Sequence, residues 1–124
     1  MNPKVLVIDD SMMVRQQVKR ALAGGFEVVE AQDGVEALEK ASQYSDFSLV
    51  ICDVNMPRMN GLDFLEEFRK NDSWKEIPAV MLTTEAQPAL VQRAKALDAK
   101  GWIVKPFKPE LLMAAAKKLM KPAA

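Results

Sequence analysis

The chain has 124 residues, of which 49% are hydrophobic and 27% are charged, an ordinary balance for one soluble globular domain. Its 17 basic and 17 acidic side chains cancel, so the composition lacks the basic excess typical of nucleic-acid-binding proteins. The sequence has no histidine and a single cysteine, Cys52, which excludes histidine-based triads, histidine metal sites and an internal disulfide.

Five apolar runs along the chain predict β-strands. The runs are Val5–Ile8, Phe26–Ala31, Ser48–Cys52, Ala79–Leu82 and Trp102–Val104. Three of them are nearly continuous in apolar content, which favours strands covered on both faces, as in a parallel sheet.

Apolar residues spaced three or four positions apart predict a helix after each run. The sets are Val14, Val18, Ala21 and Leu22; Val35, Leu38 and Ala41; Leu62, Leu65 and Phe68; Leu90, Ala94 and Leu97; and Leu112, Ala115, Ala116 and Leu119. This alternation predicts a single α/β domain over residues 1–124, with a five-stranded parallel sheet and helices on both faces.

Polar residues follow four of the predicted strands directly. Asp9 and Asp10 end the first run, Asp53 the third, Thr83 the fourth and Lys105 the fifth. Because the carboxyl ends of parallel strands share one edge, where such sheets bind ligands, we expect these side chains to meet there.

This set of side chains points to phosphoryl chemistry on a divalent cation. Three close carboxylates repel one another, and a hard cation with oxygen ligands, Mg²⁺ before zinc, resolves the repulsion. Lys105 supplies a positive charge and Thr83 a hydroxyl donor for phosphoryl oxygens. Asp53, which stands alone after the central strand, is the best candidate nucleophile. Aspartate is also a common turn residue, which is the simpler explanation for any one of them, but the complete set favours a site.

The loop after Asp53 contains two residues with special backbone properties. Pro57 fixes φ, and Gly61 permits positive φ, so both are expected to shape this turn.

Four segments, "VLVIDDS", "DVNMPRMNG", "MLTTEA" and "GWIVKPF", resemble the signature segments of response-regulator receiver domains. The resemblance covers essentially the whole chain and is strongest to the stand-alone chemotaxis regulators of the CheY type. It implies a flavodoxin-like (βα)5 fold with strand order 2-1-3-4-5.

The resemblance also implies roles for the residues at the sheet edge. Asp53 is expected to accept a phosphoryl group from a sensor histidine kinase. The side chains of Asp10 and Asp53 and the backbone carbonyl of Asn55 are expected to hold Mg²⁺, with Mn²⁺ as an alternative, and Asp9 to act mainly through metal-bound water. Lys105 is expected to bind a phosphoryl oxygen.

Further positions carry switch and turnover roles by the same resemblance. Thr83 is expected to move toward the phosphoryl group, and Trp102, where Tyr or Phe is usual, then to turn inward. Asn55 and Glu85 flank the site and are expected to tune how quickly water removes the phosphoryl group. The Lys105–Pro106 peptide bond is expected to be cis.

The sequence after the last predicted helix leaves no room for an output domain, so we expect signalling through a protein partner. The family uses the face of the fourth and fifth helices and the fifth strand for this purpose. The candidate contact residues are Gln92, Lys95, Lys100, Trp102 and Lys118. The sequence lacks a signal peptide and an apolar stretch that could span a bilayer. We therefore expect a cytoplasmic monomer that binds neither membranes nor nucleic acid.

Several alternatives remain open from the sequence. The chain could be a receiver-like interaction domain that is not phosphorylated, or an intermediate in a phosphorelay. A phosphohydrolase with an aspartate nucleophile is disfavoured because such enzymes place Asp-x-Asp after the first strand, where this chain has Asp-Asp. A flavin carrier is disfavoured because "DDSMM" is acidic where a phosphate cradle is needed.

Overall fold

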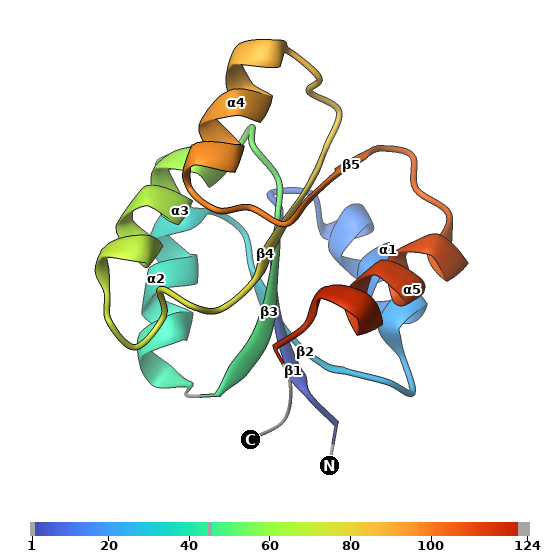
Figure 1. The fold of residues 1–124 in the computed structure, drawn as a ribbon. Coiled ribbons are helices and arrows are strands. Elements are labelled where there is room, and N and C mark those ends of the chain that lie inside the picture. Colours follow the sequence, from blue (N-terminus) through green and yellow to red (C-terminus); the bar gives the residue numbers. More distant parts are fainter. Residues whose placement is uncertain (1, 45, 122–124) are drawn as a thin grey trace.

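The computed structural model describes residues 2–44 and 46–121, which form one sheet with helices on both faces (Figure 1). The strands are β1 (Lys4–Ile8), β2 (Glu27–Ala31), β3 (Phe47–Cys52), β4 (Ala79–Thr83) and β5 (Gly101–Val104). The helices are α1 (Met12–Leu22), α2 (Gly34–Gln43), α3 (Gly61–Lys70), α4 (Pro88–Ala96) and α5 (Pro109–Leu119). All strand pairs are parallel and the order is β2-β1-β3-β4-β5, so the expected fold class and strand order are confirmed.

The sheet separates two apolar layers. Helices α2, α3 and α4 cover one face, and α1 and α5 cover the other (Figure 1). Alternate residues of β1 serve the two layers: Leu6 and Ile8 face the α2–α3–α4 side, whereas Val5 and Val7 face the α1–α5 side. This two-sided burial explains why the central strands are continuously apolar in sequence.

The helices begin at the carboxyl edge of the sheet, and the residues at or just before their first positions stabilise these starts. The side chains of Ser11, Asp33 and Asn60 accept hydrogen bonds from backbone N–H groups in the first turns of α1, α2 and α3. Pro88 and Pro109 occupy the first positions of α4 and α5, where the N–H that proline lacks is not needed.

One helical face differs from its prediction. Helix α2 buries Ala37 and Ala41, while Leu38 is partly buried and Val35 is only half-buried. The two alanines face the sheet because their small side chains let the helix approach it closely, so the buried face lies to one side of the predicted stripe.

The start of β2 also differs from its prediction. The N–H of Phe26 donates to the carbonyl of Leu22 at 3.1 Å, which keeps Phe26 in the turn after α1, and β2 begins one residue later.

Within residues 2–44 and 46–121, none of the helices has the length and apolar character required to traverse a bilayer.

Candidate functional site

The three predicted carboxylates meet at the carboxyl edge of the central strands. One carboxylate oxygen from each of Asp9, Asp10 and Asp53 lies within 4.8 Å of the others. Ile8 of β1 pairs with Cys52 of β3, so the aspartates that follow these two residues emerge side by side. Asp9 and Asp53 are buried, whereas Asp10 is exposed, which leaves the cluster open to solvent on one side.

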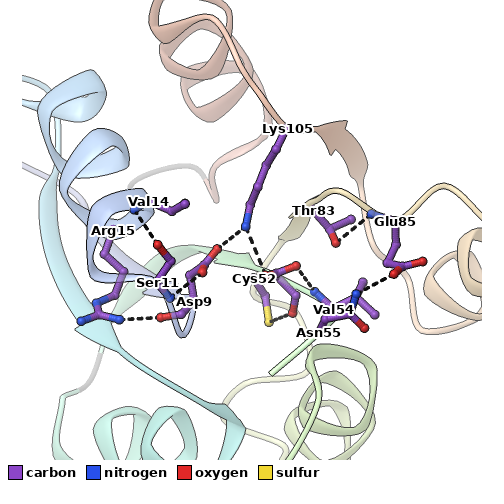
Figure 2. A network of polar contacts seen from close by, with 11 residues as sticks. Asp9, Ser11, Val14, Arg15, Cys52, Val54, Asn55, Thr83, Glu85 and Lys105 are labelled. Atoms are coloured by element: carbon purple, nitrogen blue, oxygen red, sulfur yellow. Dashed lines mark hydrogen bonds and ion pairs between the residues drawn. The ribbon is translucent and has the colours of Figure 1, made fainter. Parts of the chain in front are cut away.

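Lys105 reaches this cluster from the end of β5 (Figure 2). Its Nζ donates to Asp9 Oδ2 at 2.6 Å and to Asp53 Oδ2 at 3.1 Å. The Lys105 N–H donates to the Thr83 carbonyl at 2.9 Å, and the peptide bond to Pro106 is cis, as expected. The carboxylates and the ammonium, distant in sequence, therefore form one contact network.

Burial and charge oppose each other within this network. Burial raises the pKa of the Asp9 carboxyl, and the hydrogen bonds from Lys105 and the Ser11 N–H only partly offset it. Burial alone would lower the pKa of Lys105, but its hydrogen bonds and attraction to Asp9 and Asp53 outweigh that effect and raise it. One ammonium thus contacts two of the three clustered carboxylates, and the site favours an additional positive charge.

The donor set fits a hard divalent cation. The three carboxylates offer only oxygen ligands, and the backbone carbonyl of Asn55, two residues after Asp53, is the further oxygen that the resemblance assigns. Mg²⁺ prefers such ligands and keeps several waters, which suits a cluster with one exposed member.

Glu85 connects the other predicted residues. Its N–H donates to Thr83 Oγ1 at 3.2 Å, and its carboxylate accepts from Asn55 Nδ2 at 2.6 Å (Figure 2). Its carbonyl accepts from Trp102 Nε1 at 2.9 Å. Thr83 itself is fully buried. The residues predicted for switching and for turnover therefore belong to one hydrogen-bonded chain between the β3–α3 loop, the β4–α4 loop and β5.

The loop between β3 and α3 is shaped differently from its prediction. Gly61 does not adopt positive φ; instead, a Cβ at this position would overlap the Asp53 carbonyl oxygen, so glycine is required for a close approach. The positive φ of this loop, 64°, belongs to Arg58. Gly61 does shape the loop, but the expected reason, a positive φ, was wrong. The sequence shows that a glycine is present, but not whether the fold needs its backbone freedom or its lack of a side chain.

Arg15 is a site residue that the sequence reasoning missed. Its Nη1 donates to the Asp9 carbonyl at 2.6 Å, and its Nε donates to Glu30 Oε1 at 3.0 Å. Arg15 thereby holds the backbone that carries the acidic pair. Its place in the first turn after Asp10 was the available signal.

The residues predicted for partner contact differ in exposure. Gln92, Lys95, Lys100 and Lys118 are exposed on α4, on the α4–β5 loop and on α5. Trp102 is half-buried and packs toward the α2–α3–α4 layer, next to a cavity of about 110 Å³ between α4 and β5.

The chain matches the family described as the response regulator receiver domain over residues 5–117. It is 44% identical over 111 residues to chemotaxis protein CheY1 of Helicobacter pylori, with 88% of this chain and 90% of that protein covered. It is 39% identical over 111 residues to the chemotaxis protein CheY homolog of Campylobacter jejuni, covering 88% and 85% of the two chains. The structure of Vibrio cholerae CheY4 superposes with a TM-score of 0.90, at 44% identity and with 96% and 99% coverage. On this evidence the chain belongs to the response regulator receiver domain family.

Proposed function

We propose that this protein is a stand-alone response regulator that accepts a phosphoryl group on Asp53 from a phosphohistidine of a sensor histidine kinase. A carboxylate oxygen of Asp53 attacks phosphorus, a P–O bond forms, and the P–N bond to the histidine breaks with its electron pair returning to nitrogen. The observation that carries the proposal is the position of Asp53 in the acidic cluster, with its Oδ2 already 3.1 Å from the Lys105 ammonium.

The surrounding residues have distinct roles in this proposal. Asp10, Asp53 and the Asn55 carbonyl would hold Mg²⁺, and Asp9 would contact the ion through water. The bound cation supplies positive charge to the phosphoryl oxygens. Lys105 donates to one phosphoryl oxygen.

Thr83 and Trp102 form the switch. The Thr83 hydroxyl moves to donate to a phosphoryl oxygen, and this movement takes its Oγ1 away from the Glu85 N–H and shifts the β4–α4 loop. Trp102 moves with this loop because its Nε1 donates a hydrogen bond to the Glu85 carbonyl. Asn55 and Glu85, joined over the site by a 2.6 Å hydrogen bond, control the access of water and thus the turnover of the acyl phosphate.

The output is protein binding on the face of α4, β5 and α5. Lys95 and Lys100 line the same small cavity as Trp102, so a movement of the indole changes this surface. Gln92 and Lys118 are exposed on α4 and α5 and complete the proposed contact set. Two of the similar proteins, CheY1 and the CheY homolog, are named as chemotaxis proteins, and this similarity favours a role in chemotaxis or motility. The protein acts in the cytoplasm as a monomer.

Titration with Mg²⁺ and then beryllofluoride, followed by tryptophan fluorescence, tests this function. A Trp74→Phe background leaves Trp102 as the sole tryptophan reporter. The proposal expects a saturable Mg²⁺ response and a second, Mg²⁺-dependent response to beryllofluoride, the phosphoryl mimic. In the same background, Asp10→Asn weakens the first response and Asp53→Ala abolishes the second. If neither ligand gives a saturable signal in the parent protein, the site is degenerate and the chain is an unphosphorylated interaction domain.

A further inference from the structure

Arg58 adopts a backbone conformation that a residue with a Cβ rarely takes. Its φ of 64° lies in the left-handed region, which glycine enters without strain and other residues enter at a cost in free energy. A glycine would adopt this turn at a lower cost, so the contacts of the Arg58 side chain bear on why an arginine stands here.

That contact is a two-point ion pair with Asp33 at the N-terminus of α2. Arg58 Nε donates to Asp33 Oδ2 at 2.8 Å, and Nη2 donates to Oδ1 at 3.2 Å. The Asp33 side chain is only 5% exposed, whereas that of Arg58 is 55% exposed, so the guanidinium covers a buried carboxylate from the solvent side. Burial alone would raise the pKa of Asp33, but the hydrogen bonds from Arg58 and from the Glu36 N–H outweigh it and lower that pKa.

A second contact between neighbouring residues runs beside the ion pair. The Gly34 N–H donates to the Met59 carbonyl at 3.2 Å. A Cβ on Gly34 would lie 2.7–2.9 Å from Met59 atoms, so the two backbones pack as closely as glycine allows. Two consecutive residues of the β3–α3 loop therefore hold two consecutive residues at the start of α2.

We propose that Arg58 is a positioning residue that holds the β3–α3 loop against α2, and with it Asn55, whose carbonyl is the proposed third Mg²⁺ ligand. The loop begins at the phosphoacceptor and ends at Gly61, whose N–H donates to the Val54 carbonyl at 2.9 Å. Arg58 lies between these two ends and fixes the loop from outside the site. The metal-binding part of this inference rests on the proposed function, whereas the bracing of the loop does not.

Two substitutions remove the ion pair while keeping the local structure. Arg58→Asn retains a residue that tolerates the left-handed region but has no cation. Asp33→Asn retains an oxygen that caps the Glu36 N–H but has no carboxylate. Arg93→Gln is the matched control, because it removes an arginine–carboxylate contact of 2.7 Å to Asp63 between α4 and α3, away from this loop.

The first readout is Mg²⁺ affinity, measured by calorimetry. We expect both loop variants to raise the Kd about tenfold, the lower end of what the loss of a supporting contact costs a metal site. The double variant should raise it no more than either single variant, because the same contact is lost only once. Arg93→Gln should leave it unchanged. A Kd within twofold of the wild-type value in both loop variants would overturn the metal-binding part.

The second readout is amide hydrogen exchange at Gly34 and Gly61 in the metal-free protein. Both amides should exchange at least about tenfold faster in the loop variants and not in Arg93→Gln, because their bonds to Met59 and Val54 open more often. Unchanged exchange would overturn the bracing role. A wild type that binds no Mg²⁺ would refute the proposed function and the metal-binding part of this inference, whereas the exchange rates would still decide whether Arg58 braces the loop.

Discussion

The Lys105 ammonium joins the two buried aspartates of the site, 2.6 Å from Asp9 Oδ2 and 3.1 Å from Asp53 Oδ2. Lys105 is therefore in contact with the proposed phosphoacceptor. It partly balances the negative charge that the cation is expected to balance further, so the ammonium and Mg²⁺ act on the same carboxylates. This relationship makes opposite predictions for metal binding and for phosphorylation.

Lys105→Gln should strengthen Mg²⁺ binding and slow phosphorylation. Mg²⁺ affinity should rise several-fold, because the variant removes a positive charge that repels the cation. The rate of phosphorylation by acetyl phosphate should fall about 100-fold, the usual cost of losing one donor to a charged transition state. Calorimetry and intact-mass kinetics measure the two effects, with the exposed Lys108→Gln as the control. A parallel loss of both properties would contradict this division of labour.

Asp9→Asn should stabilise the metal-free protein at neutral pH. The pKa of Asp9 is higher in the folded than in the unfolded protein. The protonated carboxyl therefore stabilises the folded state fully at a pH below the unfolded pKa, and this stabilisation is lost as the pH rises through the folded pKa. At pH 7 the variant should be more stable by about 1 kcal/mol, because the neutral amide avoids the cost of burying a charged carboxylate, which is the largest cause of the raised pKa. The advantage should shrink as the pH falls toward the unfolded pKa.

Urea denaturation in the presence of a chelator measures this difference. The control is Asp72→Asn, whose side chain is 95% exposed and should change stability little. A wild type as stable as Asp9→Asn at pH 7 without metal would show that Lys105 fully compensates the buried charge.

Asn55 and Glu85 should act on phosphoryl lifetime as one unit, because their side chains share a 2.6 Å hydrogen bond. Asn55→Ala and Glu85→Ala should each change the lifetime several-fold, and the double variant should differ from the sum of the two by at least about 0.5 kcal/mol in activation free energy. Loss of the labelled acyl phosphate after removal of the phosphodonor gives these lifetimes. Additive effects would mean that the two residues act independently.

Trp102→Phe should destabilise the protein by about 1 kcal/mol through the loss of one hydrogen bond to the Glu85 carbonyl. Trp102→Tyr, which keeps a donor on a ring, should lose less. Chemical denaturation of the three proteins provides the comparison. Equal stability of the Phe variant and the wild type would mean that water replaces the indole without cost.

The sheet and the acidic cluster could be predicted because they follow from strong local patterns. Apolar runs fixed the central strands, and parallel pairing then required residues just past their ends, such as Asp9, Asp53 and Lys105, to share one edge. The Lys105–Pro106 cis bond and the strand order depended on the family resemblance instead.

The supporting contacts could not be predicted, because they depend on individual side-chain directions. The position of Arg15 in the first turn after Asp10 indicated that it lies near the acidic pair, but not that it donates to the Asp9 carbonyl. The left-handed φ of Arg58 was hidden because the nearby Gly61 looked like the residue for positive φ. Both arginines donate hydrogen bonds to backbone atoms or to side chains distant in the sequence. The periodicity of apolar residues gives no information about such contacts.

Intact-mass analysis after incubation with acetyl phosphate and Mg²⁺ tests the central assignment most directly. The wild type should gain one phosphoryl group, Asp53→Asn should gain none, and a chelator should prevent the gain in the wild type. Asp63→Asn, an exposed position on α3, should behave like the wild type. An unmodified wild type in the presence of Mg²⁺, or a phosphoryl group that persists in Asp53→Asn, would contradict the account.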